Sequence, residues 1–303
     1  MDLITTNNLC KEYAHRLVVN HVNMHIPEGS IYGFVGENGS GKTTIMRLLT
    51  GLANPTAGSF SLFGVENTNS KIYEVRKQLS AIVETTSLIP SMSAMDNLKY
   101  QELILGIELS SAEKEELLRK VHLEDVGKKK VKNFSLGMKQ RLGIALALMN
   151  HPKLLLLDEP MNGLDPEGIA ELRDLLIAMN QQEGITVLIS SHILSELEKI
   201  ASYYGFISKG CLIEELSAEQ LQDKCRKSLN VKVDNIAKAE EAIKALSLVD
   251  YKVFPNGDIK IYDNVAINVI LLAFGKENIN ILSINSSEES VEDYYLNLIK
   301  EVK

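Results

Sequence analysis

Hydrophobic and polar positions follow two alternating patterns along the first two thirds of the chain. Residues 31–35 and 153–157 are continuous apolar runs, as in strands that are buried on both faces. Residues 98–105 and 167–180 instead repeat apolar side chains at helical spacing. Strands that alternate with helices predict an α/β fold, in which helices cover both faces of a mostly parallel sheet. We expect a further strand at residues 186–189 and further helices at residues 43–50, 110–121 and 139–149.

The pattern changes after about residue 216. The segments that follow predict, in order, strand, helix, strand, strand, helix and strand: 229–233, 236–246, 251–254, 258–261, 265–274 and 279–284. Pro-Asn-Gly at 255–257 predicts a hairpin between the two middle strands. This order is compatible with a small ferredoxin-like α+β unit, and residues 287–300 add an amphipathic helix. We therefore expect two domains, at residues 1–216 and 217–303.

Length, composition and charge narrow the class of protein. The 303 residues are enough for two domains of ordinary size. Their 45% hydrophobic and 24% charged content is typical of a globular chain with a hydrophobic core. The net charge is -8, whereas a nucleic-acid-binding domain usually carries a basic face, so we expect no nucleic-acid partner. The lysine run at residues 128–132 is interpreted as a solvated turn.

Targeting and redox signals indicate where the chain works. The first residues do not combine a basic stretch with an apolar one, so we expect no signal peptide. The strongest apolar run, residues 154–157, is far shorter than the ~20 residues that span a bilayer. Cys10, Cys211 and Cys225 lie far apart and lack the spacing of metal ligands, which favours reduced thiols. We expect a cytoplasmic chain that only a partner protein holds at a membrane.

A phosphate-binding loop follows the strand at residues 31–35 and opens a helix. It fits G-x-x-x-x-G-K-[ST] with Gly36, Glu37, Asn38, Gly39, Ser40, Gly41, Lys42 and Thr43. Glycines let successive backbone N–H groups point at phosphate oxygens, and the helix N-terminus adds partial positive charge. We expect Lys42 at the β- and γ-phosphates, the Thr43 hydroxyl on Mg²⁺, and Thr44 at the α-phosphate.

Two carboxylates end the buried strand that follows residue 153. Asp158 and Glu159 come directly after four leucines. In phosphoryl-transfer enzymes, one carboxylate at such a place holds Mg²⁺ and another residue orients the attacking water. An ordinary strand that ends in a charged turn would explain the pair alone, but the phosphate loop upstream favours a site. We therefore expect Asp158 to hold Mg²⁺ through its water shell and Glu159 to polarise water.

The segment at residues 133–141, Asn-Phe-Ser-Leu-Gly-Met-Lys-Gln-Arg, carries a family resemblance. It resembles, in a variant form, the signature sequence of ABC-transporter ATPases, whose usual core is Leu-Ser-Gly-Gly-Gln. Ser135 and Gly137 match that core, and with the following helix N-terminus they can offer donors to phosphate. Taken alone, Ser135 is equally well explained as a helix N-cap. The departures from the core are Phe134, Leu136 and Met138.

Three further elements match the same family in its usual order. Residues 163–166, Gly-Leu-Asp-Pro, resemble the loop that follows the carboxylates, which places Asp165 at the nucleotide. His192, after Ser-Ser at the end of a buried strand, resembles the histidine that reaches the γ-phosphate. Tyr13 resembles the aromatic residue that stacks on adenine. A lone histidine or tyrosine is usually a surface or core residue, so these roles rest on order and placement.

Glu84 occupies the position where this family normally has glutamine. The resemblance places it in the loop that contacts Mg²⁺ and the membrane partner, and a carboxylate oxygen is a ligand that hard cations accept. Glu84, together with Phe-Ser-Leu-Gly-Met at residues 134–138, resembles the bacitracin and lantibiotic exporter branch. The family resemblance covers about residues 3–214.

The resemblance implies a P-loop NTPase of the ABC type, with an antiparallel β region, a helical subdomain and a small C-terminal α+β domain. It implies an ATPase subunit that uses ATP and Mg²⁺, lies at the cytoplasmic face of the membrane, and forms a head-to-tail homodimer. Residues 36–43 of one copy would face residues 135–137 of the other. A separately encoded permease would insert a coupling helix at residues 84–106, for export of a peptide antibiotic or similar amphiphile and hence antibiotic resistance.

Three alternatives remain open on the sequence. A non-transport ABC ATPase that acts on ribosomes or DNA would usually carry tandem ATPase units or long coiled coils. A P-loop kinase or GTPase would not explain Ser135, Gly137 and His192, and a purely regulatory module would not need Glu159. The permease forms the cargo pocket, so this chain does not define the cargo.

Overall fold

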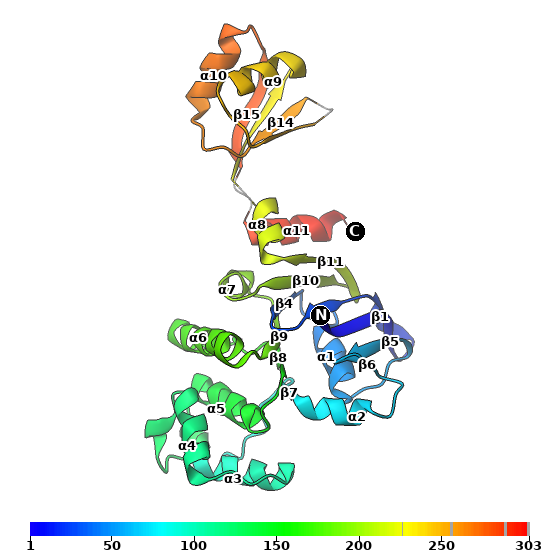
Figure 1. Cartoon of the computed structure of the whole chain (residues 1–303), viewed down its shortest axis with the longest axis vertical. Helices are drawn as coiled ribbons and strands as arrows, with labels where there is room; N and C mark the ends of the chain where they lie inside the picture. The colour runs from blue at the N-terminus through cyan, green and yellow to red at the C-terminus, as the bar shows by residue number, and fades with distance from the viewer. Residues whose placement is uncertain (226, 255–256, 288–289, 302–303) are drawn as a thin grey trace. The chain divides into compact units, whose positions relative to one another are not determined.

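The computed structural model describes residues 1–225, 227–254, 257–287 and 290–301, which form two compact units. The first unit comprises Met1–Ala218 and the second Glu219–Glu301 (Figure 1). Two residues of the expected 255–257 hairpin, 255 and 256, lie outside the described residues. Within the described part of the chain, no helix is both long and apolar enough to cross a membrane.

A six-stranded sheet forms the centre of the first unit, in the order β11-β10-β4-β9-β8-β7. Its neighbouring strands are parallel except β10 and β11. The apolar runs of the sequence are its inner strands, and every residue of β4 and β9 is buried. The strands are β4 (Ile31–Val35), β7 (Leu79–Ile82), β8 (Leu154–Asp158), β9 (Thr186–Ser191), β10 (Tyr203–Ser208) and β11 (Cys211–Ser217). The predicted α/β class is confirmed.

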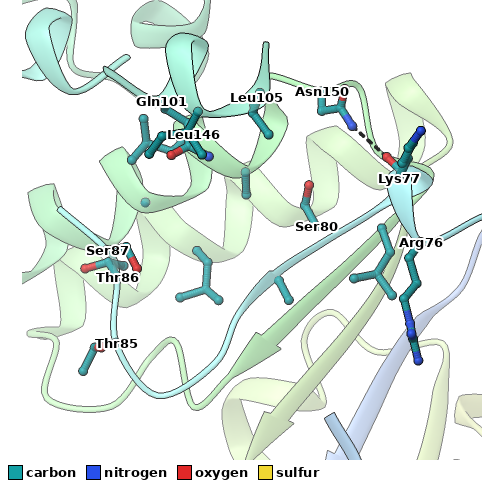
Figure 2. Close-up of a pocket in the computed structure, with 16 residues that line it drawn as sticks. Arg76, Lys77, Ser80, Thr85, Thr86, Ser87, Gln101, Leu105, Leu146 and Asn150 are labelled. Carbon is teal, nitrogen blue, oxygen red and sulfur yellow. Dashed lines mark hydrogen bonds between the residues drawn. The ribbon is translucent and has the colours of Figure 1, made fainter. Parts of the chain in front are cut away.

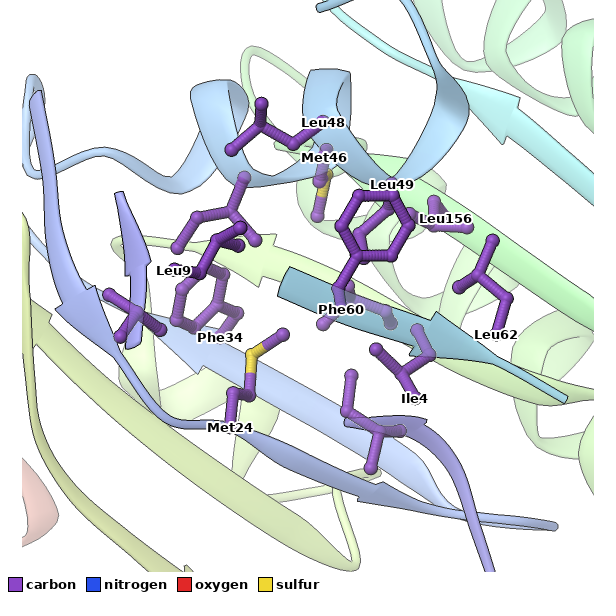
Figure 3. Close-up of a cluster of buried hydrophobic side chains, with 14 of the residues drawn as sticks. Ile4, Leu9, Met24, Phe34, Met46, Leu48, Leu49, Phe60, Leu62 and Leu156 are labelled. Atoms are coloured by element: carbon purple, nitrogen blue, oxygen red, sulfur yellow. The ribbon is translucent and has the colours of Figure 1, made fainter. Parts of the chain in front are cut away.

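A second, antiparallel sheet lies on the other side of helix α1 (Lys42–Thr50). Side chains of α1 meet strands of both sheets in one core, to which Phe34, Met46, Phe60 and Leu156 belong (Figure 3). Complete burial of each such side chain contributes about 1.5–3 kcal/mol. The helix that follows the phosphate loop is therefore held from two sides. The strands of this sheet are β1 (Asp2–Tyr13), β2 (Arg16–Val22), β3 (His25–Pro27), β5 (Ala57–Leu62) and β6 (Val65–Glu66).

Four of the remaining helices of the first unit begin at side-chain caps. Ser93 and Ser110 form capping boxes, and Ser135 and Asp165 each accept a hydrogen bond from the backbone three residues later. The helices predicted at residues 98–105 and 139–149 therefore begin earlier, at Ala94 and Leu136, because the side-chain cap fixes the first residue of the helix. The helices are α2 (Ile72–Val75), α3 (Ala94–Leu105), α4 (Ser111–Lys120), α5 (Leu136–Leu148), α6 (Pro166–Glu183) and α7 (Leu194–Leu197), with 3-10 turns at Arg76–Gln78, Glu124–Val126 and Val131–Asn133.

The second unit is a four-stranded antiparallel sheet in the order β13-β14-β12-β15 with helices packed on it. Its own hydrophobic core includes Val231, Ile243, Ile259 and Phe274. The element order is the predicted strand-helix-strand-strand-helix-strand. The elements are α8 (Ala218–Lys224), β12 (Ser228–Val233), α9 (Ile236–Ala245), β13 (Tyr251–Val253), β14 (Asp258–Ile261), α10 (Ile267–Lys276), β15 (Ile281–Ser287) and α11 (Val291–Glu301).

Candidate functional site

The carboxyl ends of three adjacent parallel strands gather most of the predicted site. β4 leads into the phosphate loop, β8 ends at Asp158, and β9 ends one residue before His192. Val35 of β4 pairs with Ser191, and Asp158 of β8 pairs with Ser190, so the three ends lie level. Open α/β sheets bind ligands at this edge.

The phosphate loop has a backbone that only glycine fits at two places. A Cβ on Gly36 would lie 2.5 Å from Ser40 Oγ and 2.6 Å from the Ile207 carbonyl oxygen. Gly41 has φ of 112°, a conformation that glycine adopts at little cost. Lys42 folds back over the loop, and its Nζ donates to the Gly36 carbonyl at 2.6 Å. Ser40 Oγ is buried and has no hydrogen-bond partner within the described residues.

A cavity of about 140 Å³ opens over this loop. Residues 38–44 and Glu159 line it, together with Val18. It therefore joins the predicted phosphate-binding residues to one predicted catalytic carboxylate, although they are more than one hundred residues apart in the sequence. The Ser40 hydroxyl and the Lys42 ammonium are among the polar groups that a bound phosphate would meet there.

Asp158 receives two hydroxyl hydrogen bonds. Thr43 Oγ1 donates to its Oδ2 at 2.7 Å, and Ser190 Oγ donates to its Oδ1 at 2.6 Å. Ser190 in turn accepts a bond from the backbone N–H of Glu159 at 2.8 Å. The Thr43 hydroxyl and the Asp158 carboxylate are hard oxygen donors, so this pair fits Mg²⁺. The sequence pattern places Ser190 shortly before His192 but does not predict its contact with Asp158.

Glu159 lies between Lys42 and His192. Its Oε2 is 2.7 Å from His192 Nδ1, and its Oε1 is 3.3 Å from Lys42 Nζ. Its backbone has φ of 49°, in the left-handed region that L-residues seldom adopt. Such strained backbones cost about 1–3 kcal/mol and cluster at functional sites. The structure thus brings the two predicted catalytic side chains into direct contact.

The three residues predicted to contact nucleotide from the signature and the following loop are not around this cavity. Ser135 caps α5 by accepting from the Met138 N–H at 3.2 Å, and Asp165 caps α6 by accepting from the Gly168 N–H at 3.0 Å. Gly137 lies in the first turn of α5. Within the described part of the chain, none of the three lines the phosphate-loop cavity. Both interpretations of Ser135 place it at a helix N-terminus, which favours anions.

Two further predicted residues, Tyr13 and Glu84, are exposed at the surface. Tyr13 is the last residue of β1, and its ring lies 4.9 Å from the Lys11 ammonium. Glu84 follows β7 and forms an ion pair with Arg47 of α1, at 2.6 Å between Nη2 and Oε1. Arg47 carried no signal in the phosphate-loop motif, because that motif ends before the second turn of the helix.

A groove of about 740 Å³ lies beside the segment that follows Glu84. Figure 2 shows Thr86 and Ser87 at one end and Arg76 and Lys77 at the other. Side chains of α3 and α5 form its remaining wall, and the Asn150 side chain donates to the Lys77 carbonyl at 2.7 Å. Part of the segment predicted to contact a partner, residues 84–106, lines this groove, together with residues 76–77, residues 79–82 and α5, which the sequence did not predict.

Comparison with known proteins gives a consistent picture. A family model described as "ABC transporter" matches residues 19–162. The bacitracin transport ATP-binding protein BcrA of Bacillus licheniformis is 41% identical over 299 residues, which are 98% of this chain and 97% of the relative. The lantibiotic transport ATP-binding protein SrtF of Streptococcus pyogenes is 47% identical over 213 residues, which are 70% of this chain and 90% of the relative.

Solved structures match between 71% and 74% of this chain. The dimeric post-hydrolysis structure of the ATP-binding cassette MJ0796, with ADP and phosphate bound, matches with a TM-score of 0.63 and 25% identity. The match covers 71% of this chain and 98% of the MJ0796 chain. The cbiO1 protein of Clostridium perfringens, part of the ABC transporter complex cbiONQ, matches with a TM-score of 0.65 and 24% identity. The match covers 74% of this chain and 91% of the cbiO1 chain. The second of these supports the fold alone.

Proposed function

The chain belongs to the ABC transporter family of ATP-binding proteins, and from that premise we propose that two copies close head to tail on ATP and drive a separate membrane permease. It is an ATP-binding and ATP-hydrolysing subunit, since this is what the family does and a solved relative holds ADP and phosphate. The observation that carries the proposal for its mechanism is the contact of Glu159 with both His192 and Lys42 beside the phosphate loop.

The site residues divide the work of hydrolysis between them. Lys42 exchanges its loop carbonyls for the β- and γ-phosphates, because a full charge is worth more there than on neutral oxygens. Thr43 and Asp158 would hold Mg²⁺, which would neutralise phosphate charge, and Glu84 would supply a further oxygen. Glu159 accepts the proton of the attacking water, and His192 fixes the orientation of that carboxylate.

One copy supplies only half of the donors that a triphosphate needs. The helix N-terminus at Ser135 and Gly137 does not line the phosphate-loop cavity of its own chain, as expected if it serves a second copy. Asp165 caps the next helix, α6, and the first turns of the two helices adjoin, since a Cβ on Gly137 would lie 3.9 Å from the Cα of Gly168. Tyr13 stacks on the adenine. Dimeric cassettes among the solved relatives support this arrangement.

The groove beside Glu84 is the surface that we assign to the permease. A segment of the permease would enter between residues 85–87 and α3, where Leu103 and Ile104 are 80% and 61% exposed. Exposed apolar side chains next to a groove mark a protein-binding surface. This contact holds the chain at the cytoplasmic face of the membrane.

The names of the relatives support the choice of cargo. Bacitracin transport and lantibiotic transport proteins match this chain, the former over nearly its whole length. We infer export of a peptide antibiotic or a similar amphiphile, with antibiotic resistance as its outcome. These matches favour transport over an ATPase that acts on ribosomes or DNA. Co-purification of the chain with a polytopic membrane protein tests that choice, and an active assembly without one would refute it.

The catalytic assignment is tested with Glu159→Gln in the purified chain. Loss of a general base lowers turnover about 10²- to 10⁴-fold, while ATP binding is retained because Lys42 and Thr43 are intact. The ATP-bound variant should accumulate as a dimer in light scattering. Glu183→Gln removes a surface carboxylate that pairs with Lys120 and serves as the matched control. Turnover of Glu159→Gln at the rate of the control would contradict the assignment.

A further inference from the structure

The ion pair between Arg47 and Glu84 joins the phosphate-loop helix to the segment that leads into the groove. The Nη2–Oε1 distance is 2.6 Å. Glu84 has φ of 68°, so a non-glycine residue is held in the left-handed region at this place. Residues 85–87, which follow directly, line the groove of Figure 2. Arg47 therefore contacts a residue that lies between the site and the groove along the chain.

Strand order places the segment that carries Glu84 at the same edge of the sheet as the catalytic carboxylate. β7 and β8 are parallel neighbours, and Ile82, the last residue of β7, pairs with Leu157. Glu84 lies two residues beyond Ile82, as Glu159 lies two residues beyond Leu157. The chain therefore passes Glu84 at the edge of the sheet where Thr43 donates to Asp158.

The position of Arg47 on α1 explains how its guanidinium holds the Glu84 carboxylate. Arg47 lies four residues after Thr43, which is about 6 Å further along the helix axis and on the same side. The pair is also weakly held, since Arg47 is 39% and Glu84 is 55% exposed. Exposed ion pairs contribute little net stability because water competes for both charges. A contact of this kind is reversible.

We propose that Arg47 is a positioning residue that holds Glu84 away from the metal-binding pair until nucleotide and Mg²⁺ arrive. Glu84 exchanges the guanidinium for the metal position at Thr43 and Asp158, and the segment at residues 85–87 moves with it. Arg47 thereby sets the Mg²⁺ concentration at which nucleotide binding moves residues 85–87, which line the groove. This inference rests on the proposed nucleotide site.

The test measures binding, with no hydrolysis, by titrating Mg²⁺ at fixed concentration of a fluorescent, non-hydrolysable ATP analogue. Arg47→Gln removes the competitor for Glu84, so the Mg²⁺ midpoint should fall by up to about fivefold, which corresponds to about 1 kcal/mol. The Mg²⁺ midpoint of Arg47→Lys should lie between those of the unmodified chain and of Arg47→Gln, because lysine keeps the charge but lacks the planar guanidinium. Arg119→Gln, which breaks an exposed pair with Glu116 on α4, is the matched control and should leave the midpoint unchanged.

Two additional measurements separate positioning from a structural role. In a Glu84→Gln background, Arg47→Gln should no longer shift the midpoint, because the competed carboxylate is gone. The chain contains no tryptophan, so Ser87→Trp gives a single reporter on the moving segment. Its emission should change with Mg²⁺ and the analogue, at a lower Mg²⁺ concentration in the Arg47→Gln variant.

The outcomes distinguish this inference from the proposed function. If Arg47→Gln leaves the midpoint unchanged or raises it, Arg47 does not compete with Mg²⁺ for Glu84 and the inference is overturned. A shift that persists in the Glu84→Gln background overturns it as well. If the unmodified chain fails to bind the analogue at any Mg²⁺ concentration, the nucleotide site itself is refuted.

Discussion

Thr43→Val tests the link between the phosphate loop and the metal-binding carboxylate. The substitution keeps the branched shape of the side chain and removes only the hydroxyl, which donates to Asp158 Oδ2 at 2.7 Å. Asp158 then keeps its other side-chain donor, Ser190 Oγ at 2.6 Å. The substitution should lower the Tm of the chain measured without nucleotide, and it should also raise the Mg²⁺ midpoint for nucleotide binding.

The structure sets the size of both effects. A hydrogen bond to a charged group contributes about 1.5–3 kcal/mol, and partial exposure of Thr43 and Asp158 reduces this to about 1–2 kcal/mol. For a unit of this size, each kcal/mol shifts Tm by about 2–4 °C, so Tm should fall by about 2–8 °C. Loss of partners that support a metal ligand costs about 10- to 100-fold in metal affinity, and the Mg²⁺ midpoint for nucleotide binding should rise at least about tenfold.

The assays are thermal unfolding without nucleotide and Mg²⁺ titration with the fluorescent analogue. Thr43→Ser retains the hydroxyl and is the matched control, with both values close to those of the unmodified chain. A Thr43→Val variant with an unchanged Mg²⁺ midpoint would refute the placement of the metal between Thr43 and Asp158. The direction is opposite to that of Arg47→Gln, so the two variants cannot both be explained by general damage to α1.

Two further variants test stability in each unit. Burial and the neighbouring Glu215 carboxylate raise the pKa of Tyr32, so its contribution to the free energy of unfolding is complete below pH about 10 and declines as the pH rises further. In urea unfolding, Tyr32→Phe should therefore lose less stability at alkaline pH than the unmodified chain does. An identical loss of stability in the variant would contradict this. Phe274→Ala should destabilise the second unit by about 3–5 kcal/mol and leave ATP binding intact; simultaneous loss of ATP binding would show that the units do not fold independently.

The parts of the site that the sequence predicted are those built from neighbouring residues. The loop from Gly36 to Thr43 combines a glycine pattern with a lysine and a helix start, and each of these constrains only the local backbone. Asp158 and Glu159 follow a fully apolar strand, and such a strand predicts burial without any knowledge of its neighbours. The family could therefore be predicted from short segments alone.

The contacts that sequence reasoning missed depend on which strands are adjacent. Ser190 reaches Asp158 because β9 pairs with β8, and a sequence pattern does not state strand order. Arg47 reaches Glu84 because α1 packs near the end of β7, at a separation of 37 residues. Hydrophobic periodicity locates helices and strands, whereas these contacts follow from how the elements are arranged in the sheet.

One helix therefore supplies partners for three carboxylates at the functional edge of the sheet. The three pairs are Lys42 with Glu159, Thr43 with Asp158, and Arg47 with Glu84. Their burial is graded along α1: the Lys42 side chain is 5% exposed, and that of Arg47 is 39% exposed. Water weakens the exposed Arg47–Glu84 pair most, so separating Glu84 from Arg47 costs less free energy than breaking either of the two more buried pairs. The core that packs α1 against two sheets fixes the positions of Lys42, Thr43 and Arg47 along one helix.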